Sequence, residues 1–154
     1  MTHYFLDSSA VVKRYVNETG SPWIRSLFIR SRGHTILIAQ ITPVEAYSAV
    51  MRRVREGTVN LSITEDLRRT FLIQIKRQYR QVSLTQQVVS QAQDLIEKYP
   101  LRAYDAVQLA SATTANERLV VEDVAPLVFV SADQRLVQAA AAEGLAVEDP
   151  GAYG

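Results

Sequence analysis

The stretch Thr35-Ile-Leu-Ile-Ala39 decides the fold class of this 154-residue chain. It is rich in β-branched residues and apolar without interruption after Thr35, as expected of a strand buried on both faces of a sheet. Such a sheet needs helices on both faces, which is the arrangement of parallel α/β folds. Similar short runs predict further strands at Tyr4–Leu6, Val82–Leu84, Leu127–Val130 and Leu145–Val147.

Helical stretches alternate with these strands. In the helix after Ala39, Thr42 is a suitable N-cap, Pro43 suits the first turn and Gly57 is the expected stop. The alternation predicts one α/β domain over residues 1–154, with a parallel sheet between two layers of helices. The predicted helices are Ser8–Val16, Trp23–Arg30, Thr42–Glu56, Ser62–Arg80, Gln86–Tyr99, Leu101–Asn116 and Asp133–Glu143.

The composition excludes several classes of protein. There are no cysteines, which rules out a disulfide framework and a thiolate metal site. No apolar run approaches the ~20 residues that span a bilayer, and Asp7 falls where a signal peptide would need a longer apolar stretch. We therefore expect a cytoplasmic protein without a membrane segment. The net charge of +1 is balanced, but basic residues cluster locally, for example at Arg52, Arg53 and Arg55.

Two acids lie at the carboxyl ends of predicted strands. Asp7 and Asp133 follow the first and fourth strands, and each has a serine nearby, Ser8 and Ser131 respectively. Ligands bind beyond the carboxyl ends of the strands in open parallel sheets, so both acids are candidates for a site. Both are also preferred helix N-caps, and the two roles are compatible because helix N-termini point to the same end of the sheet.

A third acid, Asp105, lies in a predicted helix that has no other charge between Ala103 and Ala115. Helical periodicity puts Leu109 and Ala112 on the same face, so this helix should be largely buried. A carboxylate in such a helix is costly unless it is paired or bound to a metal. The structural alternative is an ion pair with the nearby Arg102.

The fourth acid, Glu45, has a structural alternative of its own. Thr42-Pro-Val-Glu45 fits the capping box, in which the glutamate side chain reaches back to the backbone N–H of the cap residue. The residues that follow, 46–51, are mostly apolar, which places Glu45 at the edge of a buried surface. Both a capping role and a functional role remain open for this residue.

Taken together, the four acids indicate a metal site. Carboxylates brought together without cations would in part protonate, whereas a hard divalent cation removes their repulsion. Oxygen ligands select Mg²⁺ or Mn²⁺ over zinc, since only His3 and His34 could supply nitrogen and neither is well placed. The scarcity of histidine also disfavours a Ser-His-Asp hydrolase, and no Gly-rich phosphate loop is present.

Several segments, spread in order over almost the whole chain, resemble PIN-domain proteins of the VapC toxin type. The segments are Phe5-Leu-Asp-Ser-Ser-Ala-Val-Val-Lys-Arg-Tyr15 with Glu18 and Gly20-Ser21, Pro43-Val-Glu-Ala46, Arg102-Ala-Tyr-Asp-Ala-Val-Gln-Leu-Ala110, and Phe129-Val-Ser-Ala-Asp133 with Leu136 and Glu143-Gly-Leu145. One departure is the stretch Asn116–Pro126, which looks longer than the usual connection before the fourth strand.

The resemblance implies a three-layer α/β/α sandwich around a five-stranded parallel sheet. It also implies Mg²⁺- or Mn²⁺-dependent cleavage of RNA by the toxin of a type II toxin–antitoxin pair. Such toxins usually form homodimers and are blocked by a cognate antitoxin that inserts a segment near the active site. Carried over by position, the acidic cluster is Asp7, Glu45, Asp105 and Asp133, and the supporting hydroxyls are those of Ser8 and Ser131.

Our hypothesis from the sequence is hydrolysis of RNA phosphodiester bonds at a metal site. Asp7 and Asp105 are expected as direct ligands, Asp133 at a second ion or its water shell, and Glu45 in orienting the water. One alternative is a non-catalytic module that binds RNA or protein, with the acids only capping helices. Another is a phosphatase or other phosphoryl-transfer enzyme with Asp7 as nucleophile. Apolar positions in the 42–75 helices are candidates for a dimer or antitoxin surface.

Overall fold

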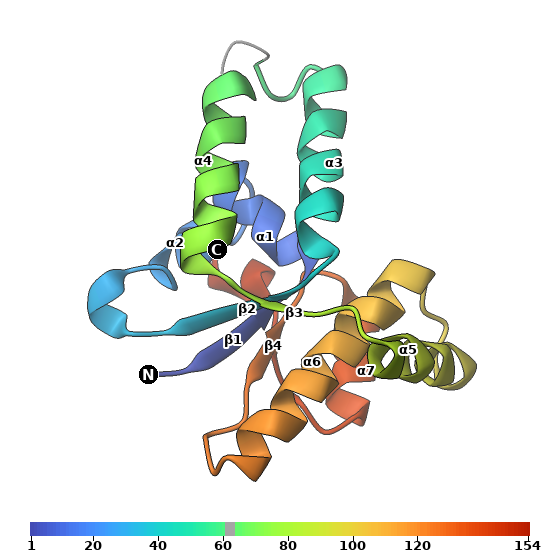
Figure 1. Ribbon diagram of the computed structural model, residues 1–154. Helices are drawn as coiled ribbons and strands as arrows, with labels where there is room; N and C mark the ends of the chain where they lie inside the picture. Colours follow the sequence, from blue (N-terminus) through green and yellow to red (C-terminus); the bar gives the residue numbers. More distant parts are fainter. Residues whose placement is uncertain (61–63) are drawn as a thin grey trace.

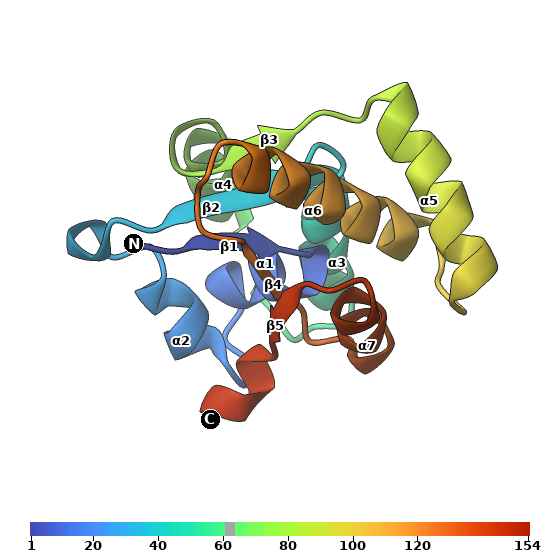
Figure 2. The ribbon, with the colours of Figure 1, turned by 90° about the horizontal axis from the view of Figure 1, so that it is seen from below.

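The computed structural model describes residues 1–60 and 64–154 of the chain. Its centre is a five-stranded parallel sheet with the strand order β3-β2-β1-β4-β5, which can be followed in Figure 2. The strands are β1 (His3–Leu6), β2 (Thr35–Ala39), β3 (Arg80–Val82), β4 (Val128–Val130) and β5 (Ala146–Glu148).

The central strands are buried on both faces because successive side chains point to opposite sides of a sheet. Phe5 of β1 is in register with Leu37 of β2 and Phe129 of β4, and all three belong to the core on one face. The rings of Phe5 and Phe129 are stacked with centroids 5.8 Å apart. Leu6 and Ile38 belong to the core on the opposite face.

Helices cover both faces, and the predicted three-layer α/β/α sandwich is confirmed (Figure 1). The face that contains Phe5 is covered by α5 (Gln86–Lys98), α6 (Ala103–Val121) and α7 (Gln134–Ala142). The other face is covered by α1 (Ser8–Tyr15), α2 (Ser21–Ser26), α3 (Thr42–Arg55) and α4 (Thr64–Gln78). Short 3-10 helices lie at Arg30–Arg32 and Pro150–Tyr153.

The prediction of a helix over Trp23–Arg30 is wrong at both ends. Helix α2 begins at Ser21 and ends at Ser26, and Arg30 begins a separate 3-10 turn. The early start follows from Gly20, which has a left-handed φ of 87°, and from the proline in the first turn. A side chain at Gly20 would also collide with the backbone of Pro150, so only glycine fits there.

The region around β3 differs from the prediction as well. The helix expected over Ser62–Arg80 ends at Gln78, and the strand expected at Val82–Leu84 lies over Arg80–Val82. The predicted helix start at Ser62 falls outside the described residues. Because β3 is an edge strand and largely exposed, it can carry Arg80 and Gln81, which an apolar pattern does not detect.

Helix α6 runs from Ala103 to Val121, whereas the sequence predicted Leu101–Asn116. The first half of the long connection noted at Asn116–Pro126 is therefore helical. Asn116 lies inside the helix, and its side-chain oxygen accepts a hydrogen bond from the backbone N–H of Leu127 at 3.0 Å. This contact ties the last turns of α6 to the residue that precedes β4.

The predicted N-cap role of Thr42 is also wrong. The residue at the N-cap of α3 is Ile41, and Thr42 is fully buried inside the first turn. Its hydroxyl lies within hydrogen-bond distance of both polar side-chain atoms of Gln108, Oε1 at 3.2 Å and Nε2 at 3.0 Å. Thr42 thus joins α3 to α6 instead of capping its own helix. Among the described helices, none is long and apolar enough to cross a membrane.

Candidate active site

A cavity of about 500 Å³ opens at the carboxyl ends of β1 and β4. The chain runs from β1 outward to β2 and β3 and then returns to the other side of β1 as β4, so this is the point where the strand order reverses. Such switch points are the usual ligand sites of open parallel sheets. All four predicted acids line the cavity: Asp7 after β1, Glu45 on α3, Asp105 on α6 and Asp133 before α7.

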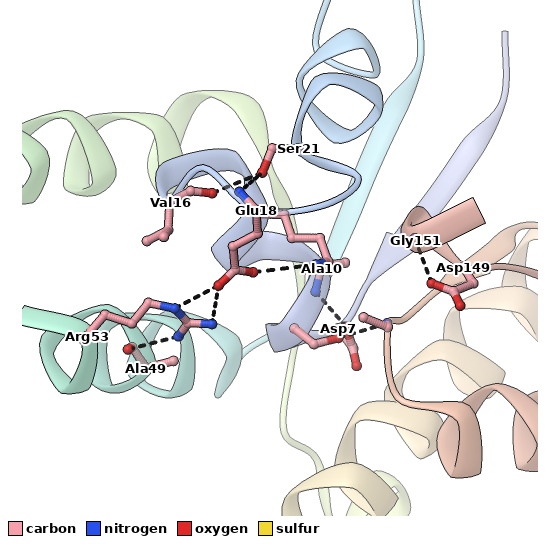
Figure 3. Close-up of polar contacts among 12 residues, drawn as sticks. Asp7, Ala10, Val16, Glu18, Ser21, Ala49, Arg53, Asp149 and Gly151 are labelled. Atoms are coloured by element: carbon pink, nitrogen blue, oxygen red, sulfur yellow. Dashed lines mark hydrogen bonds and ion pairs between the residues drawn. The ribbon is translucent and has the colours of Figure 1, made fainter. Parts of the chain in front are cut away.

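Asp7 is the most buried of the four acids, with 4 % of its surface exposed. Its Oδ1 accepts hydrogen bonds from the backbone N–H of Ala10 at 2.9 Å, drawn in Figure 3, and from the hydroxyl of Ser9 at 2.7 Å. Its Oδ2 accepts from Ser131 at 2.6 Å. Burial raises the pKa of Asp7 to about 6, although the three hydrogen bonds act in the opposite direction.

Ser131 links two of the acids. Its hydroxyl donates to Asp7 and accepts from the backbone N–H of Asp133 at 3.0 Å. Asp133 in turn is the N-cap of α7, where its Oδ1 accepts from the backbone N–H groups of Arg135 and Leu136. Asp7 is likewise the N-cap of α1. Both aspartates are thus helix caps and cavity residues at the same time, as the sequence allowed.

Asp105 lies in the first turn of α6 and is half-buried, while the middle of the helix behind it is buried as predicted. Burial raises the pKa of its carboxyl, and the negative charges of Asp133 and Glu45 raise it further. Arg102 lines the same cavity and opposes these effects, but in the described part of the chain it forms no ion pair with Asp105. The structural alternative for Asp105 is therefore not observed.

Glu45 does not form the predicted capping box. Its Oε2 accepts a hydrogen bond from the hydroxyl of Ser8 and another from the side-chain amide of Gln108 at 2.8 Å. A capping box needs Thr42 at the N-cap of α3, but that position is occupied by Ile41. Ser8 therefore contacts Glu45, and Ser131 contacts Asp7, so each predicted hydroxyl orients a different carboxylate.

Gln108 is a site residue that the sequence reasoning missed. Its side chain is 1 % exposed, and its amide donates to Glu45, to Ser8 at 2.9 Å and to Thr42 at 3.0 Å. The sequence does contain an indication of its role. Gln108 is a long polar residue in an apolar helix, three positions after Asp105 and so on the same face.

Part of the cavity rim is cationic, with Lys13, Arg52, Arg53 and Arg102 among the lining residues. Glu18 accepts hydrogen bonds from Nε of Arg53 at 2.7 Å and from Nζ of Lys13 at 3.4 Å, and all three residues line the cavity. Figure 3 shows Arg53 also donating to the backbone oxygen of Ala49, and the backbone N–H of Glu18 donating to Ser21. The glutamate thus fixes two cationic side chains at the edge of the cavity.

The donor set suits a hard divalent cation. The four predicted carboxylates line one cavity together with Glu18, and burial or mutual repulsion raises the pKa of both Asp7 and Asp105, a cost that a cation would offset. Within the described residues, no three acids or histidines are already close enough together to hold an ion. Both histidines lie away from the cavity, His3 at the amino end of β1 and His34 just before β2.

Comparison with known proteins identifies the family. The family model of the PIN domain matches residues 4–141, and the chain therefore belongs to the PIN-domain family. Among curated proteins, none matches the chain.

Solved structures share the fold at low sequence identity. PAE2754 from Pyrobaculum aerophilum has a TM-score of 0.67 and 18 % sequence identity to this chain. The match covers 99 % of this chain and 86 % of the PAE2754 chain. A chain of a toxin–antitoxin complex from Klebsiella pneumoniae has a TM-score of 0.57 and 14 % identity, covering 96 % and 97 %. A chain of VapBC2 from Rickettsia felis, bound to a DNA fragment from its promoter, has a TM-score of 0.61 and 12 % identity, covering 96 % and 98 %.

Proposed function

We propose that this PIN domain is a Mg²⁺- or Mn²⁺-dependent endoribonuclease of the VapC type, the toxin of a type II toxin–antitoxin pair. The observation that carries the proposal is the convergence of four carboxylates from four different elements on one cavity at the switch point of the sheet. The similarity of the fold to chains of toxin–antitoxin complexes supports the biological role. This role places the protein in the cytoplasm, with its RNA substrate and its antitoxin.

In this proposal Asp7, Asp105 and Asp133 bind the metal, and Glu45 orients the attacking water. An ion held by these aspartates would supply Lewis-acid chemistry, which lowers the pKa of a water molecule and offsets charge on the leaving oxygen. Ser131 holds Asp7 in place through its hydrogen bond to Oδ2, and Ser8 with Gln108 holds Glu45. These contacts fix the carboxylates before substrate arrives, so that little reorganisation is needed during the reaction.

The cationic rim would bind the RNA backbone. Lys13, Arg52, Arg53 and Arg102 line the same cavity as the acids, so a phosphodiester held by these side chains lies beside the carboxylates. A contact of this kind is electrostatic, and RNA affinity should therefore fall steeply as the salt concentration rises.

Partner binding is the second half of the proposal. Leu72 and Ile73 of α4 are about half exposed, within the 42–75 helices that are candidates for a homodimer or antitoxin surface. Light scattering after size-exclusion chromatography should show a homodimer, and a larger complex when the antitoxin is co-expressed. A monomer under both conditions would contradict this part of the proposal.

The two alternatives make different predictions. A non-catalytic module is favoured by the capping roles of Asp7 and Asp133, and it predicts no specific Mn²⁺ binding. A phosphoryl-transfer enzyme with Asp7 as nucleophile predicts a covalent phospho-aspartate at this residue. A Mn²⁺ titration tests the first alternative, and trapping of a phospho-aspartate tests the second.

The central experiment compares wild type with Asp105→Asn on a mixed RNA pool, with and without Mg²⁺ or Mn²⁺. Asparagine keeps the shape of the side chain and removes the charge that binds the ion. The matched control is Asp94→Asn, which removes an exposed acid from α5, outside the cavity. We expect metal-dependent cleavage by wild type and by the control, and none by Asp105→Asn. Equal cleavage by all three would indicate a contaminant and overturn the assignment.

A further inference from the structure

A second cavity of about 480 Å³ adjoins the carboxylates. It shares Ser8, Glu45 and Arg52 with the first cavity, so the two cavities are adjacent. Its other walls include Ile41, Val44 and Tyr104 and are mainly apolar. The volume lies within the ~300–1,000 Å³ that is typical of small-molecule sites.

Two large apolar side chains stand exposed at this cavity. Val44 is 74 % exposed and Tyr104 is 61 % exposed. Val44 directly precedes Glu45 on α3, and Tyr104 directly precedes Asp105 on α6. Val44 and Glu45 line this cavity together, whereas Asp105, turned by about 100° from Tyr104 on the helix, lines the adjacent first cavity. Exposed apolar groups gathered around one cavity usually indicate a binding surface.

Tyr104 differs from every other tyrosine in the chain. The other six each have a hydrogen-bond partner for the hydroxyl or an aromatic neighbour for the ring, namely Tyr4, Tyr15, Tyr47, Tyr79, Tyr99 and Tyr153. Tyr104 has neither among the residues that the structure describes. Its ring is therefore free on the apolar wall of the cavity, one residue before a proposed metal ligand.

We propose that this second cavity is a nucleobase subsite, in which the base of a nucleotide next to the scissile phosphate stacks on Tyr104. The inference rests on the proposed nuclease function and names the substrate more closely. Each ribose in an RNA strand carries a base and is joined to the phosphates on either side. A phosphodiester bound at the carboxylates therefore has a base attached to the neighbouring ribose, close to the second cavity. Arg52, which lines both cavities, lies where the backbone passes from one to the other.

The subsite defines the class of RNA that the enzyme takes. A base in a duplex is stacked and paired and cannot present its face to a protein ring, whereas bases in loops and single strands can. Stacking on an aromatic ring tolerates any base, because every base has a π-face. Tyr104 therefore takes an unpaired base at this position and does not select its identity.

The test measures binding of single-stranded oligouridylate and of an oligomer of equal length in which abasic ribose replaces every nucleotide. The protein is the full chain carrying Asp105→Asn, in Mg²⁺, so that no cleavage disturbs the measurement. Stacking is worth ~1–3 kcal/mol per base, and Tyr104→Ala should therefore weaken binding of oligouridylate about 5- to 150-fold. Binding of the abasic oligomer should not change.

Two variants control this measurement. Tyr104→Phe keeps the ring and should keep the preference for oligouridylate. Tyr153→Ala removes another exposed tyrosine, at the C-terminal 3-10 helix and outside both cavities, and should change neither affinity. The melting temperature of each variant confirms that it is folded.

The outcomes separate the subsite from the proposed function. Salt-sensitive binding with equal affinity for the two oligomers, or equal weakening of both by Tyr104→Ala, would overturn the subsite and leave RNA binding in place. Equal affinity for a duplex would also overturn it. If no RNA binds at any salt concentration, the nuclease proposal fails and the subsite fails with it. An apolar protein segment as the true occupant would show as binding of the antitoxin lost in Tyr104→Ala, with oligouridylate affinity unchanged.

Discussion

The side-chain amide of Gln108 donates a hydrogen bond to Glu45 at 2.8 Å, across 63 positions of sequence. The same amide lies 2.9 Å from the hydroxyl of Ser8 and 3.0 Å from that of Thr42. One neutral side chain from α6 thus orients the glutamate of α3 and links it to the first residue of α1. The position of Glu45 in the cavity depends on this link.

Gln108→Ala should destabilise the fold. It leaves the buried hydroxyl of Thr42 without its partner and the carboxylate of Glu45 with Ser8 alone, at a cost of about 1–3 kcal/mol. Urea unfolding gives the free energy of unfolding of the variant and of wild type. The control is Gln93→Ala, at an exposed position of α5, which should stay within about 0.5 kcal/mol of wild type. Equal stability of both variants would show that the network contributes nothing.

Asp7→Asn should stabilise the metal-free protein at neutral pH. The pKa of Asp7 is raised from 3.8 to about 6 in the folded state, so the folded protein binds the proton more tightly than the unfolded chain does. Stability from this residue is therefore full below pH 3.8 and is lost as the pH rises to about 6. The loss is about 2–3 kcal/mol, at 1.36 kcal/mol per unit of pKa.

Urea unfolding in EDTA tests this prediction. The difference in unfolding free energy between Asp7→Asn and wild type should be small at pH 4 and grow to its full value by pH 7. Saturating Mn²⁺ should then stabilise wild type more than the variant, since an ion that binds only the folded state adds its binding free energy to stability. A difference that does not change with pH would mean that Asp7 titrates normally.

Glu18→Gln should destabilise the protein and disorder the cationic rim. Lys13 is nearly buried, and without the charge of Glu18 both Lys13 and Arg53 lose their ion pair, while Arg53 keeps its hydrogen bond to the backbone of Ala49. Hydrogen bonds to charged groups contribute about 1.5–3 kcal/mol, and we expect a loss in this range. The matched control is Glu65→Gln, which breaks a well-exposed ion pair with Arg69 and should cost less than about 1 kcal/mol. Equal effects of the two variants would contradict a structural role for Glu18.

Arg52→Ala should weaken RNA binding without affecting metal binding. Each phosphate contact with a single strand contributes about 0.7 to the slope of log affinity against log salt concentration, so loss of one contact should lower the slope by about that amount. Fluorescence anisotropy at several salt concentrations measures it. Arg118→Ala is the control and should leave the slope unchanged. Arg118 is exposed in the last turn of α6, whereas Asp105 lies in the first turn. An unchanged slope in Arg52→Ala would exclude Arg52 from the RNA path.

Features that depend on local pattern were predictable from the sequence. β2 has the predicted bounds, and the acids Asp7 and Asp133 lie at strand ends as expected. The predicted fold class is correct because buried parallel strands carry an unbroken apolar run. β3 was placed two residues too late, since an exposed edge strand needs no apolar residues.

Contacts between distant segments could not be predicted in the same way. The capping box at Thr42-Pro-Val-Glu45 is locally plausible, but Ser8 and Gln108 compete for the glutamate and Thr42 is buried against α6. Gln108 was missed because its partners lie on two other helices, and no local pattern specifies them. The sequence thus indicated which acids meet, but not which side chains hold them in place.

The hydrogen bond between Ser131 and Asp7 spans 124 positions of the chain. Asp7, Glu45 and Asp105 are therefore synthesised before β4, which pairs with β1 and brings Ser131 and Asp133 to the cavity. A nascent or prematurely terminated polypeptide that stops before β4 lacks these two residues and cannot assemble the complete acidic cavity. For the nuclease proposed above, this order of synthesis keeps the chain inactive until translation is nearly finished.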